Sequence, residues 1–218
     1  NAAGSIAVLV FAEGNLSRAQ AGNEDLLREW TARGRWNEAA TVLGNLAMTL
    51  LERGRLGESL CAMRDAVALA ERGGHPLAAQ RAAKDNVHIL VRCGLLARAE
   101  EEAGRFVAAW EATAPSPTSF VLASLGESFF AHGRLDDGCA QFRRAVDGFI
   151  ATGSADDAAD TLAQWGLVEM AAGRIAEARD CRAEIEPMRR ETSGLTRSAI
   201  ALLDAGMAPA LGDNQTDN

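Results

Sequence analysis

The feature that most constrains the fold of this chain is an internal repeat of about 40 residues. Glycines at the same place in five segments follow one another at spacings of 40, 40, 39 and 40 residues: Gly14, Gly54, Gly94, Gly133 and Gly173. A small or short side chain lies seven residues before each glycine: Ala7, Ala47, Val87, Gly126 and Gly166. Another lies five residues after each: Ala19, Ser59, Ala99, Gly138 and Ala178. A fixed period of this length is typical of repeat architectures, in which each unit packs against its neighbours.

A second series of turn signals divides every repeat in two. It lies 20 or 21 residues after the first series and comprises Gly34, Gly74, Ala114, Gly153 and Gly194. Glycine beyond a helix end readily takes the left-handed conformation that closes the last turn. Each repeat is therefore predicted to be a pair of helices of roughly 16 to 18 residues each.

Apolar residues recur at helical spacing within these segments. Val42, Leu46 and Leu50 form the i, i+4, i+8 stripe of a helix that is buried on one side. The positions four and three residues before the turn glycine are apolar in every unit except the last, where Glu169 breaks the pattern. No segment alternates with period two for long, and 44 alanines with no tyrosine favour helix over strand. The predicted fold class is all-α.

The repeat resembles the tetratricopeptide (TPR) family. The pattern is clearest in Leu125-Gly126, Gly133-Arg134-Leu135, Phe142 and Ala145, and it recurs in Leu46-Ala47 and Gly54-Arg55-Leu56. The period is 40 residues instead of 34, and the proline that usually closes a TPR unit is absent or displaced. Longer units of this kind are similar to the helical-repeat modules of large ATP-dependent bacterial transcriptional regulators. The resemblance implies a right-handed α-solenoid whose concave wall is lined by the first helix of each pair.

The repeat also predicts the domain organisation. We expect a single domain over residues 1–206 and a disordered tail over 207–218. The domain comprises units at about 1–34, 35–74, 75–114, 115–153 and 154–194 and a capping helix at 195–206 that turns Arg197 and Asp204 to solvent. The segment from Ser5 to Phe11 is apolar almost all round, which predicts that upstream domains of a larger chain, or a second copy in a homodimer, cover it.

Charge and cysteine usage exclude several classes of function. The net charge of −8 argues against a nucleic-acid binder, which needs a basic face for phosphates. No apolar run approaches the ~20 residues of a membrane span, and no signal peptide is recognisable. The four cysteines stand far apart and form no CxxC or Cys/His cluster: Cys61, Cys93, Cys139 and Cys181. We expect free thiols, no metal site and a cytoplasmic location.

No sequence pattern of an enzyme is present. The chain has no phosphate-binding loop, no dinucleotide fingerprint, no HExxH and no GxSxG elbow. His75 is predicted to lie in a turn and His132 at a helix C-terminus, where a partial positive charge suits the helix dipole. The prediction is a protein without catalytic residues and without a cofactor.

One group of side chains suggests a binding surface. Arg81, Lys84, His88 and Arg92 are spaced i, i+3, i+7 and i+11, which places them on one face of the first helix of the third unit. We call these four residues the basic stripe. By the TPR resemblance this face lines the concave groove, where the neighbouring first helices contribute Met48, Leu51, Phe120, Glu127 and Phe130.

Two interpretations of the basic stripe stay open. It is either a solvated, ion-paired helix face, or part of a groove in which cations fix an acidic peptide and apolar side chains add contact area. The function predicted from the second interpretation is a protein-interaction scaffold, the regulatory module of a larger bacterial signalling or transcription protein. The alternative is a module that senses a small-molecule effector.

Overall fold

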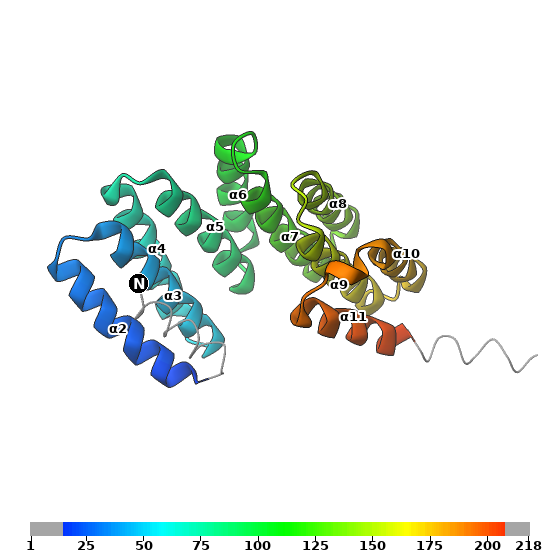
Figure 1. Ribbon diagram of the computed structural model, residues 1–218, viewed down its shortest axis with the longest axis horizontal. Helices are drawn as coiled ribbons and strands as arrows, with labels where there is room; N and C mark the ends of the chain where they lie inside the picture. The colour runs from blue at the N-terminus through cyan, green and yellow to red at the C-terminus, as the bar shows by residue number, and fades with distance from the viewer. Residues whose placement is uncertain (1–14, 208–218) are drawn as a thin grey trace, which may run out of the picture. The chain divides into compact units, whose positions relative to one another are not determined.

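The computed structural model describes residues 15–207, without the side chains of 189–191, and in this part of the chain every regular element is helical. The first five helices are α2 (Leu16–Ala32), α3 (Trp36–Glu52), α4 (Leu56–Gly73), α5 (Pro76–Arg92) and α6 (Leu96–Trp110). They are followed by α7 (Pro115–Ala131), α8 (Leu135–Ala151), α9 (Ala155–Ala171), α10 (Ile175–Ile185), the 3-10 helix η1 (Glu186–Glu191) and α11 (Gly194–Met207) (Figure 1). The predicted all-α fold class is confirmed.

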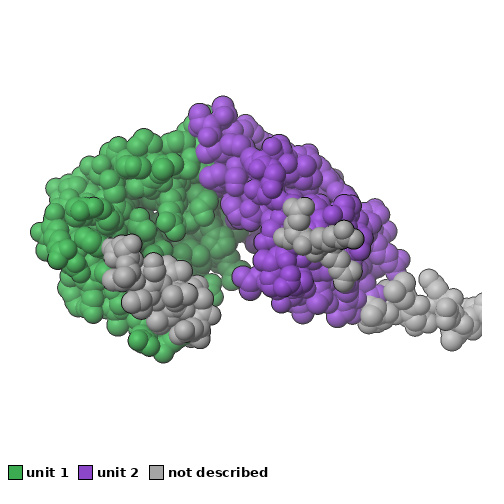
Figure 2. Space-filling model, viewed as in Figure 1, with its two compact units in different colours: residues 1–110 green, residues 111–218 purple. Residues whose placement is uncertain are grey.

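The chain divides into two compact units, residues 1–110 and residues 111–218 (Figure 2). In each unit, helices that are consecutive in sequence pack against each other. First helices of adjacent pairs also touch, since α3 contacts α5 and α9 contacts both α7 and α11. The first helices therefore form a continuous layer within each unit, and this layer positions the candidate site. The prediction of a single domain over residues 1–206 stays a prediction.

The turns lie where the glycine spacing predicts them. Among the described residues, seven glycines adopt φ between +66° and +79°, in the left-handed region: Gly34, Gly54, Gly74, Gly94, Gly133, Gly153 and Gly173. Gly14 lies outside the described residues. The prediction of a helix-ending turn at Gly194 is wrong, because this glycine is the first residue of α11 and has no positive φ. The 3-10 turn η1 comes before it, so this glycine begins a helix instead of ending one.

Replacing Gly94 by alanine tests the turn conformation. An alanine side chain at this position meets no atom within 4 Å, so any cost comes from the backbone φ of +71°. We expect the free energy of unfolding to fall by about 1 kcal/mol, the penalty of a left-handed non-glycine residue. The measurement is urea unfolding followed by circular dichroism. Gly57→Ala, in open space inside α4, is the control and should be neutral or stabilising. Equal effects of the two substitutions would contradict this account.

The small residues on either side of each turn lie where paired helices approach most closely. Ala47 and Ser59 are fully buried, and the Ser59 hydroxyl donates a hydrogen bond of 2.8 Å to the carbonyl oxygen of Ala47. This bond joins α4 to α3. In the second unit, Gly126 of α7 lies against the ring of Phe142 of α8. Residues larger than these would hold the paired helices apart.

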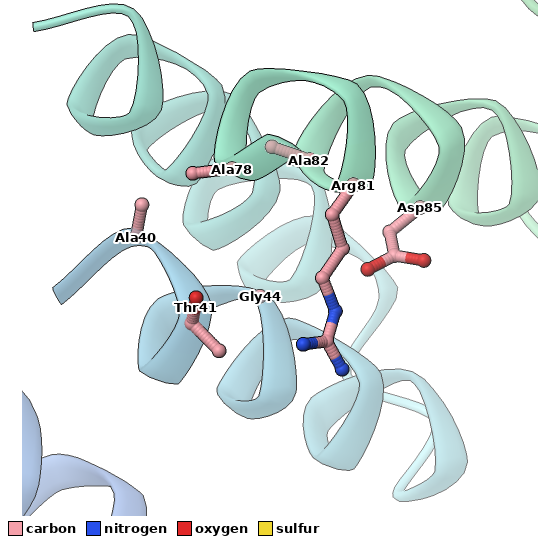
Figure 3. A pocket seen from close by; sticks show the side chains of 7 residues that line it. All are labelled: Ala40, Thr41, Gly44, Ala78, Arg81, Ala82 and Asp85. Atoms are coloured by element: carbon pink, nitrogen blue, oxygen red, sulfur yellow. The ribbon is translucent and has the colours of Figure 1, made fainter. Parts of the chain in front are cut away.

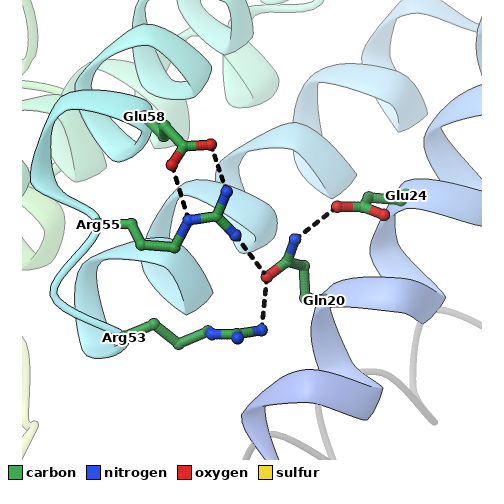
Figure 4. Close-up of polar contacts among 5 residues, drawn as sticks. All are labelled: Gln20, Glu24, Arg53, Arg55 and Glu58. Atoms are coloured by element: carbon green, nitrogen blue, oxygen red, sulfur yellow. Dashed lines mark hydrogen bonds and ion pairs between the residues drawn. The ribbon is translucent and has the colours of Figure 1, made fainter.

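A polar network ties α2 to the turn between α3 and α4 (Figure 4). The guanidinium groups of Arg53 and Arg55 donate hydrogen bonds to the Gln20 side-chain oxygen at 2.7 and 3.2 Å. Gln20 in turn donates to Glu24 at 2.6 Å, and Arg55 is held by Glu58 at 2.7 Å. The network lies at the surface, so it orients α2 and contributes little to stability.

Among the described residues of the second unit, the buried core contains one charged side chain. Glu169 of α9 is fully buried and accepts hydrogen bonds from the Trp165 indole at 2.8 Å and from the Cys139 thiol at 3.2 Å. Its other carboxylate oxygen lies 3.0 Å from Nε of Arg174, an ion pair without hydrogen-bond alignment. Glu169, which breaks the apolar sequence pattern, is therefore the centre of a buried polar network.

In helix α11, Arg197 is exposed and Asp204 is half-buried, and the role of this helix as a polar cap stays a prediction. Asp204 accepts a hydrogen bond of 2.6 Å from Arg182, and Arg197 donates one of 2.6 Å to the carbonyl oxygen of Thr192. The same helix also carries two exposed apolar side chains, Leu195 and Leu202, which are 85% and 63% exposed. The predicted N-terminal apolar segment, the homodimer contact based on it, and the tail beyond residue 207 lie outside the described residues.

Candidate functional site

The basic stripe lies on α5, whose ends the sequence defines clearly. Pro76 occupies the first turn, where its missing N–H has no partner to lose, and the left-handed Gly94 follows the C-terminus. The helix contacts α3, α4 and α6. Its buried face comprises Gln80, Ala82, Val87, Ile89 and Leu90. With 3.6 residues per turn, the basic stripe lies roughly opposite the centre of this buried face.

The structure separates the four residues of the basic stripe into two kinds. Arg81 and Arg92 are exposed, whereas Lys84 and His88 are half-buried. The ammonium nitrogen of Lys84 lies 2.8 Å from a carboxylate oxygen of Asp85. Sequence reasoning missed Asp85, although its place four residues after Arg81 put it on the same helix face. The stripe is thus two exposed guanidinium groups on either side of an ion pair and a histidine.

His88 is held in its neutral form by its surroundings. Burial lowers the pKa of the imidazole, and the positive charges of Arg92 and Lys84 lower it further. The carboxylates of Asp85 and Glu52 act in the opposite direction without reversing the shift. Glu52 is the last residue of α3, so a charge from the neighbouring first helix also acts on His88.

A shallow depression lies between α3 and α5 beside Arg81 (Figure 3). Its lining is made by Ala40, Thr41 and Gly44 of α3 and by Ala78, Arg81, Ala82 and Asp85 of α5. Small side chains form its floor, and the Arg81 side chain extends along it toward α3 (Figure 3). We call this depression, with the basic stripe that continues along α5, the α3–α5 groove.

Two of the remaining candidate residues are core side chains. Leu51 is 7% exposed and Phe130 is 9% exposed, so both are core side chains that offer no contact area to a partner. The expectation that they line a groove is corrected for this reason. Met48 is half-buried and packs against the core of the first unit.

Two candidates from the second unit keep some exposure. Phe120 is 42% exposed, and its ring packs edge-on against Phe149 at 4.8 Å between centroids. Glu127 is half-buried on the same helix, α7. Both belong to residues 111–218, whereas the basic stripe belongs to residues 1–110. A binding role for Met48, Phe120 and Glu127 stays a prediction.

The charge of the chain is distributed unevenly between the two units. Residues 1–110 contain 13 basic and 13 acidic side chains, and residues 111–218 contain 9 and 17. The whole net charge of −8 therefore comes from the second unit. An acidic ligand that approaches the α3–α5 groove meets a unit without net negative charge.

The described residues contain neither a cluster of metal ligands nor a membrane-spanning helix. Among residues 15–207, no three histidine, cysteine or carboxylate side chains come together as metal ligands would. Within the same range, every helix is too short or too polar to cross a bilayer.

The architecture is that of a TPR-like helical-repeat protein, and comparison with solved structures supports this class. The chain is similar to BtubC (BKLC) from P. vanneervenii, with a TM-score of 0.66 and 17% identity over 87% of this chain and 79% of that one. It is also similar to the TPR-like repeats of a putative kinesin light chain from Podosopora anserina, with a TM-score of 0.63, 15% identity and coverage of 88% and 96%.

A third similar structure is MamA, residues 41 to the end, from Desulfovibrio magneticus RS-1. Its TM-score is 0.55, with 17% identity over 88% of this chain and 96% of that one. No family model and no curated protein sequence matches the chain. At these identities the likeness concerns the fold. None of these three structures is described as a transcriptional regulator, so the regulator context receives no support from them.

Proposed function

We propose that this chain is a protein-interaction scaffold that binds an acidic segment of a partner protein along the α3–α5 groove. The observation that carries the proposal is the exposure of Arg81 and Arg92 at the two ends of the basic stripe. Eleven residues of helix separate them by about 16 Å, the length of a short peptide segment. Among residues 15–207, no carboxylate lies within ion-pair distance of either guanidinium.

The shape of the groove favours a peptide over a small molecule. Small-molecule sites enclose roughly 300 to 1,000 Å³ and bury most of their ligand. The depression beside Arg81 is instead shallow and open to solvent, and it has a floor of small side chains. Such a surface suits an extended or helical segment whose carboxylates meet successive guanidinium groups. The small-molecule alternative therefore has less support, and no observation favours an enzymatic role.

A charge-removal experiment tests the proposal. The probe is a 12-residue peptide rich in aspartate, labelled with tetramethylrhodamine and measured by fluorescence anisotropy at low salt. The triple variant Arg81→Ala, Lys84→Ala, Arg92→Ala should bind it at least about tenfold more weakly than wild type, because charge-assisted hydrogen bonds to exposed carboxylates are lost. Circular dichroism should show unchanged helix content.

The matched control removes the same charge elsewhere in the first unit. Arg64, Arg98 and Arg105 lie exposed on the second helices α4 and α6, and their replacement by alanine leaves the groove intact. This variant should keep near wild-type affinity. Equal loss in both triple variants would mean that the peptide responds to net charge alone, and unchanged binding in the stripe variant would exclude the groove.

A further inference from the structure

His88 occupies an unusual place in the α3–α5 groove. It lies one helical turn after Lys84 and one turn before Arg92, so cations stand on both sides of it on the same helix, each about 6 Å away along the axis. The charged groups that act on it are Lys84, Asp85 and Arg92 from α5 and Glu52 from α3. Helices α4 and α6 also pack on α5.

The free protein resists protonation of this histidine. A proton on His88 would place a third positive charge between Lys84 and Arg92, in a half-buried position where hydration of the imidazolium is incomplete. These are the same causes, burial first and then the two cations, that lower the pKa of His88. The two nearby carboxylates only partly offset them.

A bound acidic segment would instead favour protonation of His88. Its carboxylates would neutralise Lys84 and Arg92 and would bring negative charge to the imidazole. We propose that binding of an acidic partner in the α3–α5 groove is coupled to uptake of one proton at His88, so that the partner binds more tightly as the pH falls. This inference rests on the proposed function and adds a regulatory property to the same site.

The direction and the size of the pH dependence of binding follow from thermodynamic linkage. If the partner raises the pKa of His88, protonation of His88 strengthens the partner's binding by the same factor. The affinity is constant above the pKa of the complex and rises as the pH falls toward the lower pKa of the free protein. A rise of one pKa unit corresponds to a tenfold change in affinity. Tenfold is therefore the upper limit for a rise of one unit, and we expect binding severalfold tighter at pH 5.5 than at pH 8.

The experiment uses the full chain and the aspartate-rich peptide, whose label and carboxylates keep a nearly constant charge over this pH range. Dissociation constants are measured at pH 8.0, 7.0, 6.0 and 5.5 for wild type and for His88→Gln, which cannot take up the proton. His75→Gln is the matched control, because His75 is exposed at the start of α5. Wild type and His75→Gln should show the pH dependence, and His88→Gln should lose it.

A direct measurement makes the result independent of any folding defect in the variant. Titration of the His88 imidazole by NMR in wild type should give a pKa below 6.5 for the free protein and a higher value with the peptide bound. Binding that is the same at every pH, or a pH dependence retained in His88→Gln, would overturn the proton coupling while leaving the scaffold function intact. Absence of binding at every pH would overturn both.

Discussion

Replacement of Gly126 by alanine should lower the free energy of unfolding by about 2 kcal/mol. Gly126 lies inside α7, and a methyl group at this position would lie 2.7 to 2.9 Å from three ring atoms of Phe142. The Phe142 ring is fully buried and stacks on Trp165 at 5.9 Å between centroids, so it has no free space to move into. Overpacking of this kind costs about 1 to 3 kcal/mol and outweighs the better helix propensity of alanine.

The control for this prediction is Gly104→Ala in α6. Gly104 is also a helix-interior glycine, but an added methyl group meets nothing within 4 Å. Here only helix propensity changes, and we expect the protein to gain up to about 1 kcal/mol. Both variants are measured by urea unfolding with circular dichroism. Stabilisation by both alanines would show that α7 and α8 do not approach as closely as the structure indicates.

The second large effect is expected at Glu169. Glu169→Ala removes the ion pair with Arg174 and leaves the buried indole N–H of Trp165 without an acceptor. It also opens a cavity in the core. Removal of one partner from a buried ionic network costs about 3 to 5 kcal/mol. Because the Arg174 side chain is 28% exposed and can reach water, we expect the lower end, about 3 kcal/mol.

Two further variants separate the contributions at this position. Glu169→Gln keeps an acceptor for Trp165 and loses only the charge, so its cost should be about half that of the alanine. Glu177 is the matched control, because its carboxylate lies 3.5 Å from the same Nε of Arg174 but is 45% exposed. Glu177→Ala should cost less than about 1 kcal/mol, as exposed ion pairs do. Equal costs for Glu169→Ala and Glu177→Ala would contradict the buried network.

The parts of the fold that follow from local rules could be predicted from the sequence. Helix lengths, the left-handed turns at Gly54 and Gly133 and the buried small residues at Ala47 and Ser59 all appear in the structure as the 40-residue period indicates. Gly194 shows the limit of such rules. Its spacing places a turn glycine there, but the preceding helix α10 ends early in a 3-10 turn.

The candidate site could be predicted only in part. The helical spacing of Arg81, Lys84, His88 and Arg92 placed them on one face of α5, and the structure agrees for that helix. The spacing does not show which of these side chains form ion pairs. Pairing of Lys84 with its sequence neighbour Asp85 depends on rotamers and on how α3 packs alongside.

The sequence by itself determined where this chain turns, which residues are helical and which positions must be small. These properties depend on local backbone conformation and on the period that the repeats share. Only the tertiary structure decided that Phe130 is core, that Glu169 is buried with Trp165 and Cys139, and that Arg81 borders a depression next to Thr41. Each of these outcomes depends on side chains from helices distant in the sequence, and the packing of the helices brings those side chains together.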